Sequence, residues 1–279
     1  MPAETPDDQF APENAAPAEV PLRPAPPPVP KAWSPRDLVL FLFVSALLLV
    51  VVSPLLMYTA YAVLRPLAGW RTPVGALGNN PYFLLTVQST FYVLLLGYVY
   101  FLVAVNYRQP FWAALAWHKP TTRQVVLFFL GGILLCLAVQ LAPPLLPDVE
   151  DFPLLRLFTS PQAAYAIAAF AILVAPLAEE LIFRGVLFRF FECQVGVRLA
   201  IAGTAALFAG MHVPQYWGAW NHVLLICLVG VVFSLARGLT GSLVPSVILH
   251  ISYNTGLMIA FFFETHQFRA LGYFVFPWR

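Results

Sequence analysis

The sequence contains few charged residues, and this scarcity excludes most classes of soluble protein. Lys, Arg, Asp and Glu together make up 10% of the 279 residues, whereas hydrophobic residues make up 60%. A soluble domain usually carries about 25% charged residues, because its surface must stay hydrated. The composition therefore predicts an integral membrane protein whose partner is the lipid bilayer.

The basic residues are scattered, and the formal net charge is only +2. The sequence lacks a Lys- and Arg-rich stretch of the kind that follows a nucleic-acid backbone, so we expect no nucleic-acid partner. The three cysteines, Cys136, Cys193 and Cys227, fit neither a CxxC metal or redox pattern nor a disulfide framework. We interpret them as small apolar side chains.

The first 36 residues differ in composition from the rest of the chain. They are rich in Pro, Ala and acidic residues and have no apolar periodicity, so they cannot bury enough surface to offset the entropy of ordering. They also lack the basic and apolar regions of a signal peptide. We expect residues 1–36 to form a disordered tail and residues 37–279 to form a helical membrane domain.

Seven apolar runs follow this tail, separated by polar or turn-rich segments. They lie at about residues 38–63, 82–105, 125–142, 163–187, 197–213, 221–236 and 243–263. A membrane-spanning helix needs ~20 apolar residues. The pattern predicts an all-α fold, a polytopic membrane helix bundle with about seven transmembrane helices and a range of six to eight.

The distribution of basic residues predicts the orientation, because cytoplasmic loops are enriched in Lys and Arg. With the N-terminus inside, nine basic residues lie on the cytoplasmic side: Arg23, Lys31, Arg36, Arg108, Lys119, Arg123, Arg189, Arg198 and Arg237. Five lie on the opposite side: Arg65, Arg71, Arg156, Arg269 and Arg279. This bias favours a cytoplasmic N-terminus. Frequent Ala, Leu, Pro and Arg with little Lys is typical of a GC-rich bacterial genome, which indicates a bacterial cytoplasmic (inner) membrane.

A few polar residues interrupt the apolar runs at bilayer depth. They are Glu179, Glu180, Arg184, His212, His250 and Asn254. Ionisable side chains inside a bilayer are rare, face the interior of a bundle and usually mark function. These residues are therefore the candidates for a functional site, although each also has a structural explanation.

The two glutamates of "LAEELIFRG" are expected to differ in role. Glu180 and Arg184 are four residues apart and share one helix face, which predicts a structural ion pair. Glu179 is rotated by about 100° from Glu180 and has no basic residue one turn away. Another helix, water or a metal must compensate its charge, or it becomes protonated. A poised general base and a protonated glutamate bonded to another helix are both consistent with the sequence.

The remaining polar residues lie on two other runs. His212 ends one run, where a histidine is often merely interfacial. His250 and Asn254 are one turn apart and continue a polar stripe that begins at Ser246. Such a stripe faces the bundle core or a wet cavity, and a structural hydrogen-bond seam is the alternative. Together, however, one carboxylate, two imidazoles and one carboxamide are the set that hydrolysis needs, because they can activate water and bind an oxyanion.

Three ordered motifs carry a resemblance to a known family. "EELIFRG" resembles the EExxxR motif of the CPBP family, which comprises CAAX proteases and bacteriocin-processing enzymes. "FAGMH", from Phe208 to His212, is similar to its FxxxH motif, and "HISYN", from His250 to Asn254, to its HxxxN motif. The resemblance covers about residues 163–256.

This resemblance implies an all-helical intramembrane endopeptidase. By similarity, Glu179 with His212 would activate water, and His250 with Asn254 would stabilise the oxyanion. Glu180, Arg184 and Phe208 would support them. The expected substrate is a membrane-associated peptide or protein. The prenylated C-terminal tetrapeptide of the eukaryotic enzymes is not carried over, because a bacterium need not prenylate its proteins.

The sequence is consistent with both a metal-free and a zinc-dependent reaction. It has no HExxH motif, the usual helical zinc-protease pattern. Glu179, His212 and His250 would supply a three-ligand zinc site with one position open for water. Because these residues are scattered over three helices, we expect no cofactor and keep zinc as the alternative.

Two other functions compete with catalysis. The same polar residues would also suit a non-catalytic membrane scaffold or immunity protein that binds a peptide. A proton-coupled transporter is the third candidate and the weakest, since the sequence shows none of the duplicated segments common in transporters.

Overall fold

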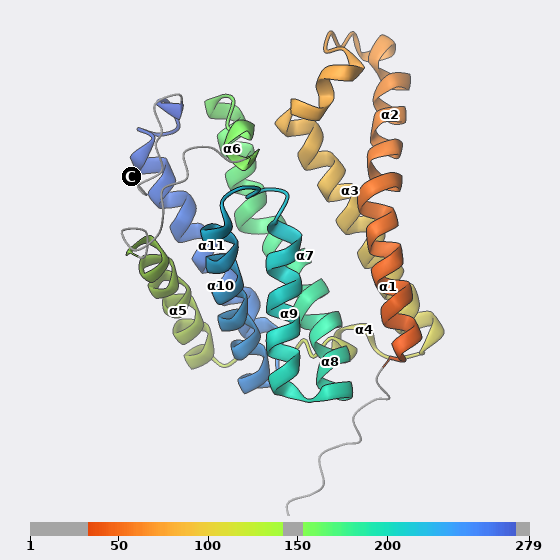
Figure 1. Cartoon of the computed structure of the whole chain (residues 1–279), viewed down its shortest axis with the longest axis vertical. Coiled ribbons are helices and arrows are strands. Elements are labelled where there is room, and N and C mark those ends of the chain that lie inside the picture. The colour runs from red at the N-terminus through yellow and green to blue at the C-terminus, as the bar shows by residue number, and fades with distance from the viewer. Residues whose placement is uncertain (1–32, 142–152, 272–279) are drawn as a thin grey trace, which may run out of the picture. The chain divides into compact units, whose positions relative to one another are not determined.

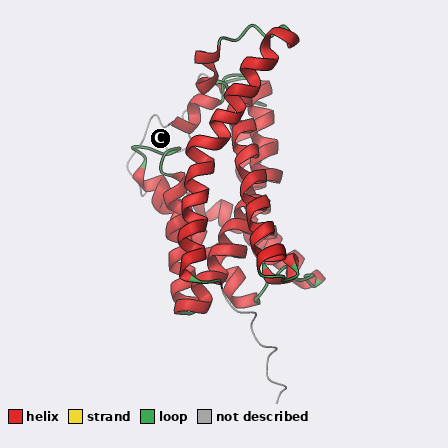
Figure 2. Ribbon diagram, turned by 90° about the vertical axis from the view of Figure 1, so that its right-hand side faces the viewer, coloured by secondary structure: helices red, strands yellow, loops and turns green. Residues whose placement is uncertain are grey.

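The computed structural model describes residues 33–141 and 153–271, and within these ranges the chain is helical and without strands (Figures 1 and 2). By its internal contacts the chain divides into two units, Met1–Lys31 and Ala32–Arg279. All described residues belong to the second unit. The prediction of an all-α polytopic helix bundle is confirmed.

Six helices within the described ranges are long and apolar enough to cross a bilayer. They are Pro35–Ala68, Pro81–Asn106, Thr122–Leu141, Pro161–Val195, Trp220–Thr240 and Val244–Glu264. A shorter apolar helix, Val197–His212, brings the number of apolar segments to that of the predicted runs. Hydropathy alone was sufficient to locate all of these segments.

Three of these segments consist of several helical elements joined end to end. The first contains α1 (Pro35–Leu47), η1 (Leu48–Val52) and α2 (Ser53–Ala68), and the second contains α3 (Pro81–Tyr100) and η3 (Phe101–Asn106). The fourth contains α6 (Pro161–Ala169), η6 (Phe170–Val174), α7 (Ala175–Glu180), η7 (Leu181–Leu187) and α8 (Phe188–Val195). The other long helices are α5 (Thr122–Leu141), α9 (Val197–His212), α10 (Trp220–Thr240) and α11 (Val244–Glu264). The short elements η2 (Val74–Asn79), α4 (Phe111–Ala114) and η5 (Pro153–Leu157) lie between them.

Helix α1 begins at Pro35, slightly before the predicted end of the tail at residue 36. Ser34 caps the helix, because its side chain accepts the backbone N–H of Asp37 while the Asp37 carboxylate accepts the backbone N–H of Ser34. Pro35 suits the first turn, where its missing N–H costs nothing. Residues 1–32 of the predicted tail lie outside the described residues.

Helix α11, which carries His250 and Asn254, packs closely against α5, and this contact fixes its position (Figure 1). A Cβ atom at Gly132 would lie 1.8 Å from the Ser252 hydroxyl and 2.4 Å from the Leu249 carbonyl oxygen. One turn further along α5, Cys136 packs against Gly256, where a Cβ would lie 2.9 Å from the sulfur. Small residues let membrane helices approach closely, and van der Waals packing then replaces the hydrophobic effect as the main attraction.

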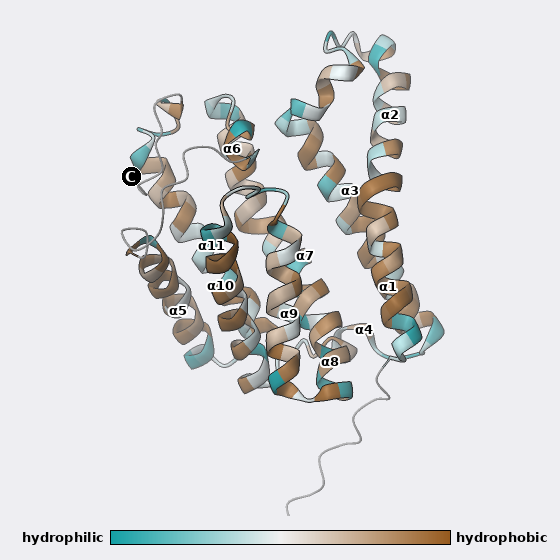
Figure 3. Ribbon diagram, in the orientation of Figure 1, coloured by the Kyte–Doolittle hydropathy of each residue, from teal (hydrophilic) through white to brown (hydrophobic). Residues whose placement is uncertain are grey.

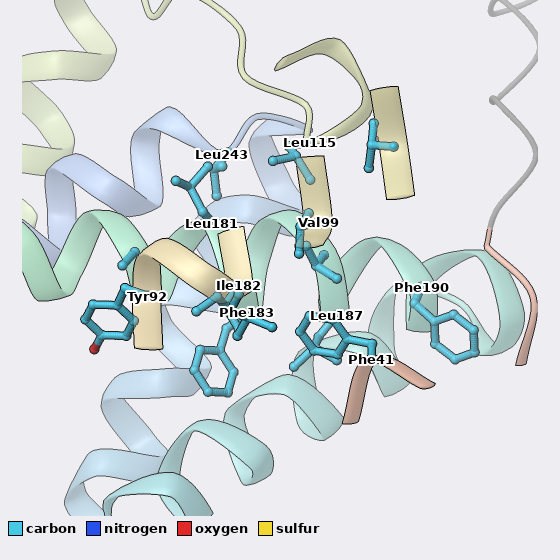
Figure 4. Packing of buried hydrophobic residues seen from close by; sticks show 14 of the residues in the cluster. Phe41, Tyr92, Val99, Leu115, Leu181, Ile182, Phe183, Leu187, Phe190 and Leu243 are labelled. Carbon is cyan, nitrogen blue, oxygen red and sulfur yellow. The ribbon is translucent and has the colours of Figure 1, made fainter. Parts of the chain in front are cut away.

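The largest buried cluster joins α3 to the fourth apolar segment. Figure 4 shows Tyr92 at one end of this cluster, followed by Ile182 and Phe183 and then by Leu187. Many apolar side chains outside the cluster remain exposed, such as Leu55 on α2 and Leu127 on α5. Hydrophobic residues accordingly make up most of α1 and α5 in Figure 3. In a membrane protein these surfaces face lipid, so the polar residues of the interior stand apart from the apolar exterior.

Candidate active site

The segment that carries the two glutamates changes helical register on either side of them. The short helix α7 ends at Glu180 and lies between the π-helical stretches η6 and η7. Pro176 lies near the start of α7, where it removes a backbone donor and crowds the preceding turn. Single π-helical turns occur often at functional sites. The irregular backbone leaves carbonyl groups available to other helices.

Glu180 and Arg184 form the predicted ion pair, and both side chains are fully buried. The Arg184 Nη1 atom donates to Glu180 Oε1 at 2.8 Å, and both side chains are 0% exposed. A buried charge pair needs further hydrogen bonds to offset its desolvation. Helix α10 supplies them, because Arg184 also donates to the Gly230 carbonyl at 2.8 Å and to the Ser234 hydroxyl at 3.3 Å. The pair therefore binds the fourth apolar segment to α10.

Phe208 lies against the charged and imidazole groups of the site. The Arg184 guanidinium lies 4.6 Å from the centre of its ring, within the range of a cation–π contact. The His212 ring lies 4.6 Å from it and the His250 ring 5.9 Å. One phenyl ring on α9 thus contacts groups from all three motifs.

His250 reaches both glutamates from α11. Its Nδ1 atom lies 2.9 Å from Glu180 Oε1, and its Nε2 atom lies 3.9 Å from Glu179 Oε2. A carboxylate can only accept, so Nδ1 carries a proton and donates to Glu180. The ring is buried and stacks on Phe233 at a centroid distance of 4.4 Å. His250 is therefore held by Glu180 and Phe233 with Nε2 directed towards Glu179.

Glu179 has a partner that the sequence did not reveal. The Tyr92 hydroxyl, on α3, donates to Glu179 Oε1 at 2.9 Å. The Glu179 side chain is 16% exposed, unlike its fully buried neighbour. Another helix, water or a metal was predicted to compensate this carboxylate. Of these the structure shows other helices, because α3 contacts one oxygen and α11 approaches the other.

His212 has a more local environment at the end of α9. Its Nδ1 atom lies 2.7 Å from the backbone carbonyl of Phe208, one turn earlier, and its side chain is half-buried. Since a carbonyl oxygen only accepts, Nδ1 carries the proton and Nε2 is the free acceptor of the neutral ring. His212 approaches the other site residues through the Phe208 ring rather than through a direct hydrogen bond among the described residues.

Asn254 is oriented by the irregular backbone near Pro176. Its side-chain nitrogen donates to the Ala171 carbonyl at 2.7 Å. In the π-helical register of η6 the Ala175 N–H bonds to the Phe170 carbonyl, so the Ala171 carbonyl would pair with the N–H of residue 176. That residue is proline and has no N–H. The Asn254 amide therefore donates to the Ala171 carbonyl in place of the N–H that Pro176 lacks.

Arg237 lies within helix α10 and not in the polar connection that the sequence predicted after residue 236. The sequence assigned it to a polar connection on the cytoplasmic side, because a charge ended the apolar run at residue 236. Helix α10 instead continues to Thr240, and Arg237 is only 1% exposed. It donates to the Arg184 carbonyl at 3.2 Å, and its guanidinium lies 3.9 Å from the Glu192 carboxylate. Arg237 therefore stabilises the backbone of η7 beneath the site.

The structure thus brings Glu179, Glu180, Arg184 and His250 into one buried network, with Phe208 beside it. Asn254 lies one turn from His250 on α11 and is tied to η6. Within residues 33–141 and 153–271, no three His, Cys, Asp or Glu side chains are grouped so as to hold a metal ion. The fold and the site together define the class of this protein. It is a polytopic membrane helix bundle with a buried network of acidic and histidine side chains.

Comparison with known proteins finds a family model that matches the segment carrying this site. Residues 161–256 match the family model described as type II CAAX prenyl endopeptidase Rce1-like. The match begins at the first residue of α6 and includes all three motifs, so the predicted resemblance to the CPBP, or CAAX protease, family is confirmed. No curated protein and no solved structure matches the chain. The chain is an integral membrane protein, a segment of which matches the model of a protease family, and Tyr92 lies outside that segment.

Proposed function

We propose that this protein is an intramembrane endopeptidase that hydrolyses peptide bonds of membrane-associated peptides or proteins. We place it in a bacterial cytoplasmic membrane with its N-terminus in the cytoplasm. The single observation that carries the proposal is the approach of His250 Nε2 to Glu179 Oε2 at 3.9 Å, inside the segment that matches the protease family. This separation exceeds a direct hydrogen bond and is one that a water or a substrate oxygen can bridge.

In the proposed reaction Glu179 accepts a proton from water while the water oxygen bonds to the scissile carbonyl carbon. The electron pair of the carbonyl moves onto its oxygen and forms the oxyanion. The carbon–nitrogen bond then breaks, and the leaving nitrogen takes the proton that Glu179 holds. General base catalysis of this kind contributes about 10²–10⁴-fold to rate. His212 shares the proton through Nε2, which its Nδ1 contact with the Phe208 carbonyl leaves free.

The oxyanion is assigned to His250 and Asn254. The Asn254 amide has two N–H groups, and the contact with Ala171 uses one of them. The second can donate to a substrate oxygen. His250 Nε2 donates to an oxyanion when the ring carries both protons. Preorganised donors of this kind are usually the largest single contribution to such reactions.

Zinc is the alternative to a metal-free reaction: the donor types suit it, whereas no three of them are grouped as a metal site within the described residues. The Nδ1 atoms of His212 and His250 both face oxygen acceptors, which is how proteins commonly orient histidine ligands. Glu179 would complete the three-ligand set with both Nε2 atoms. A bound zinc would polarise the scissile carbonyl and acidify water.

The proposal is tested with the purified full chain in lipid nanodiscs. The probes are two quenched-fluorescence peptides, one with a farnesylated C-terminal Cys-aliphatic-aliphatic-X sequence and one with an unprenylated apolar segment of about 20 residues. We expect cleavage of at least one probe. Glu179→Gln and His212→Ala should abolish cleavage without lowering the yield of folded protein.

Two substitutions serve as matched controls. Glu264→Gln removes an exposed carboxylate from the end of α11, and His118→Ala removes an exposed imidazole outside the matched segment. Both should keep wild-type cleavage. Full cleavage by both Glu179→Gln and His212→Ala would contradict the proposal, as would stable binding of the probes without any cleavage, which favours a scaffold or immunity protein.

A further inference from the structure

We infer that the Tyr92 hydroxyl is a positioning group for the Glu179 carboxylate, an inference that rests on the proposed function. Tyr92 donates to Glu179 Oε1 at 2.9 Å from α3, which lies outside the segment that matches the protease family. The contact links residues 87 positions apart in the chain. The N-terminal part of the bundle therefore contributes a group to the site.

The Tyr92 ring is held firmly enough for its hydroxyl to define a position. The residue is 6% exposed and belongs to the buried cluster that includes Phe91, Leu95 and Phe183. Figure 4 labels Tyr92 and Phe183 within this cluster. Its ring lies nearly parallel to that of Phe170, with an interplanar angle of 8° and a centroid distance of 6.2 Å. A buried tyrosine hydroxyl needs a hydrogen-bond partner, and the Glu179 carboxylate accepts its proton.

Fixing one oxygen of Glu179 orients the other. The side chain has three rotatable bonds, and no basic residue on its own helix lies one turn away to restrain it. With Oε1 bound by Tyr92, Oε2 faces His250 Nε2 at 3.9 Å. Tyr92 thus sets the distance across which the proposed water is activated. A misplaced base costs rate rather than substrate affinity, because the ground-state contacts of the substrate are unchanged.

The ring of Tyr92 also borders the backbone that orients Asn254. Phe170, on which the ring stacks, is followed by Ala171, whose carbonyl accepts the Asn254 amide. Removing only the hydroxyl keeps this stacking surface. Tyr92→Phe is therefore the informative substitution, because it separates the hydrogen bond to Glu179 from the packing of the ring.

The experiment compares Tyr92→Phe with Tyr98→Phe in the full chain in nanodiscs. Tyr98 lies on the same helix, and its hydroxyl has no hydrogen-bond partner among the described residues. With the better cleaved of the two peptide probes, Tyr92→Phe should lower kcat by about 10-fold, the loss typical of a hydrogen bond to a charged group. Its KM should stay within about twofold of wild type. Tyr98→Phe should leave both values unchanged.

A second measurement reports on the carboxylate without cleavage. Dicyclohexylcarbodiimide modifies carboxyl groups in membranes, and mass spectrometry locates the product. Since the Tyr92 hydroxyl occupies Oε1, its removal should make Glu179 react faster in Tyr92→Phe than in wild type and in Tyr98→Phe. Unchanged labelling would overturn the inference even if no probe peptide is cleaved.

The two proposals fail in different ways. If wild type cleaves, Glu179→Gln does not, and Tyr92→Phe keeps the wild-type kcat, only the role of Tyr92 is wrong. An equal loss in Tyr98→Phe, or a change confined to KM, also overturns it, because either result points to general packing or binding. If wild type cleaves neither probe, the proposed function fails, and the labelling alone decides whether Tyr92 restrains Glu179.

Discussion

His250 donates through Nδ1 to Glu180 Oε1 at 2.9 Å, the same oxygen that Arg184 binds at 2.8 Å. A single carboxylate oxygen therefore joins the EExxxR segment to α11. The spacing predicted an ion pair of Glu180 with Arg184, and in the structure Glu180 also orients the imidazole that approaches Glu179. The supporting glutamate thus lies between the structural arginine and the proposed oxyanion site.

Replacing Glu180 tests this shared role. Glu180→Gln keeps the shape of the side chain but leaves Arg184 as a buried cation without its carboxylate. Breaking a buried ion pair costs about 3–5 kcal/mol, so the free energy of unfolding should fall by this order. Cleavage should fall as well, because His250 loses a charged acceptor. Thermal unfolding and probe cleavage in nanodiscs measure the two effects.

The matched control is Glu264→Gln, which makes the same chemical change at an exposed position. Such a substitution usually alters stability by less than about 0.5 kcal/mol. If Glu180→Gln were as stable as this control, the buried network would not contribute to the fold.

A glycine on α5 provides a test at a distance from the site. Gly132→Ala would place a methyl group 1.8 Å from the Ser252 hydroxyl and 2.4 Å from the Leu249 carbonyl, so α5 and α11 must separate. Overpacking of this kind costs about 1–3 kcal/mol or more. Because α11 carries His250 and Asn254, kcat should fall together with the thermal stability.

The adjacent glycine is the control for this substitution. A Cβ atom at Gly131 would meet only a Leu249 methyl group at 4.0 Å, which is ordinary contact. Gly131→Ala should therefore keep activity and gain slightly in helix propensity. Equal behaviour of the two alanine variants would mean that the spacing between α5 and α11 does not govern the site.

The sequence predicted what depends on local spacing. Apolar runs located all seven segments, since a bilayer demands a minimum length of apolar helix. The pair Glu180 and Arg184 followed from their separation by one turn, and the polar stripe of α11 placed His250 and Asn254 on one face. The described geometry agrees with each of these expectations.

Contacts between distant helices could not be predicted in this way. Tyr92 is one aromatic residue on an apolar helix, and nothing in its neighbourhood distinguishes it as a partner of Glu179. Arg237 ended an apolar run in the sequence but lies buried, because Glu192 and the Arg184 carbonyl satisfy it. Hydropathy describes a residue alone, whereas burial of a charge depends on partners that the fold supplies.

Removal of metal provides a test of the metal-free reaction. The sequence lacks a helical zinc motif, and no three potential ligands among the described residues are grouped so as to hold a metal ion. We expect active protein to contain less than stoichiometric zinc by elemental analysis and to keep its activity after chelation. Equimolar zinc that is lost together with activity, and restores activity when added back, would instead assign Glu179, His212 and His250 as ligands.

Pro176 allows a substitution with opposite effects on stability and activity. In Pro176→Ala, residue 176 regains an N–H that can bond to the Ala171 carbonyl, the acceptor that Asn254 now uses. Relief of a proline within a helix is worth up to about 3 kcal/mol, so the melting temperature should rise. The Asn254 amide loses its fixed orientation, so kcat should fall by about 10-fold or more, in the range of a lost oxyanion donor.

Pro161→Ala is the matched control, because Pro161 opens α6 in the first turn, where a missing N–H is harmless. It should leave both melting temperature and kcat near wild type. A Pro176→Ala variant that gains stability and keeps the wild-type kcat would show that Asn254 does not need the carbonyl that the proline frees. If kcat falls by the same factor in Pro176→Ala and in Asn254→Ala, and the double variant is no worse than either, the two residues act through one contact.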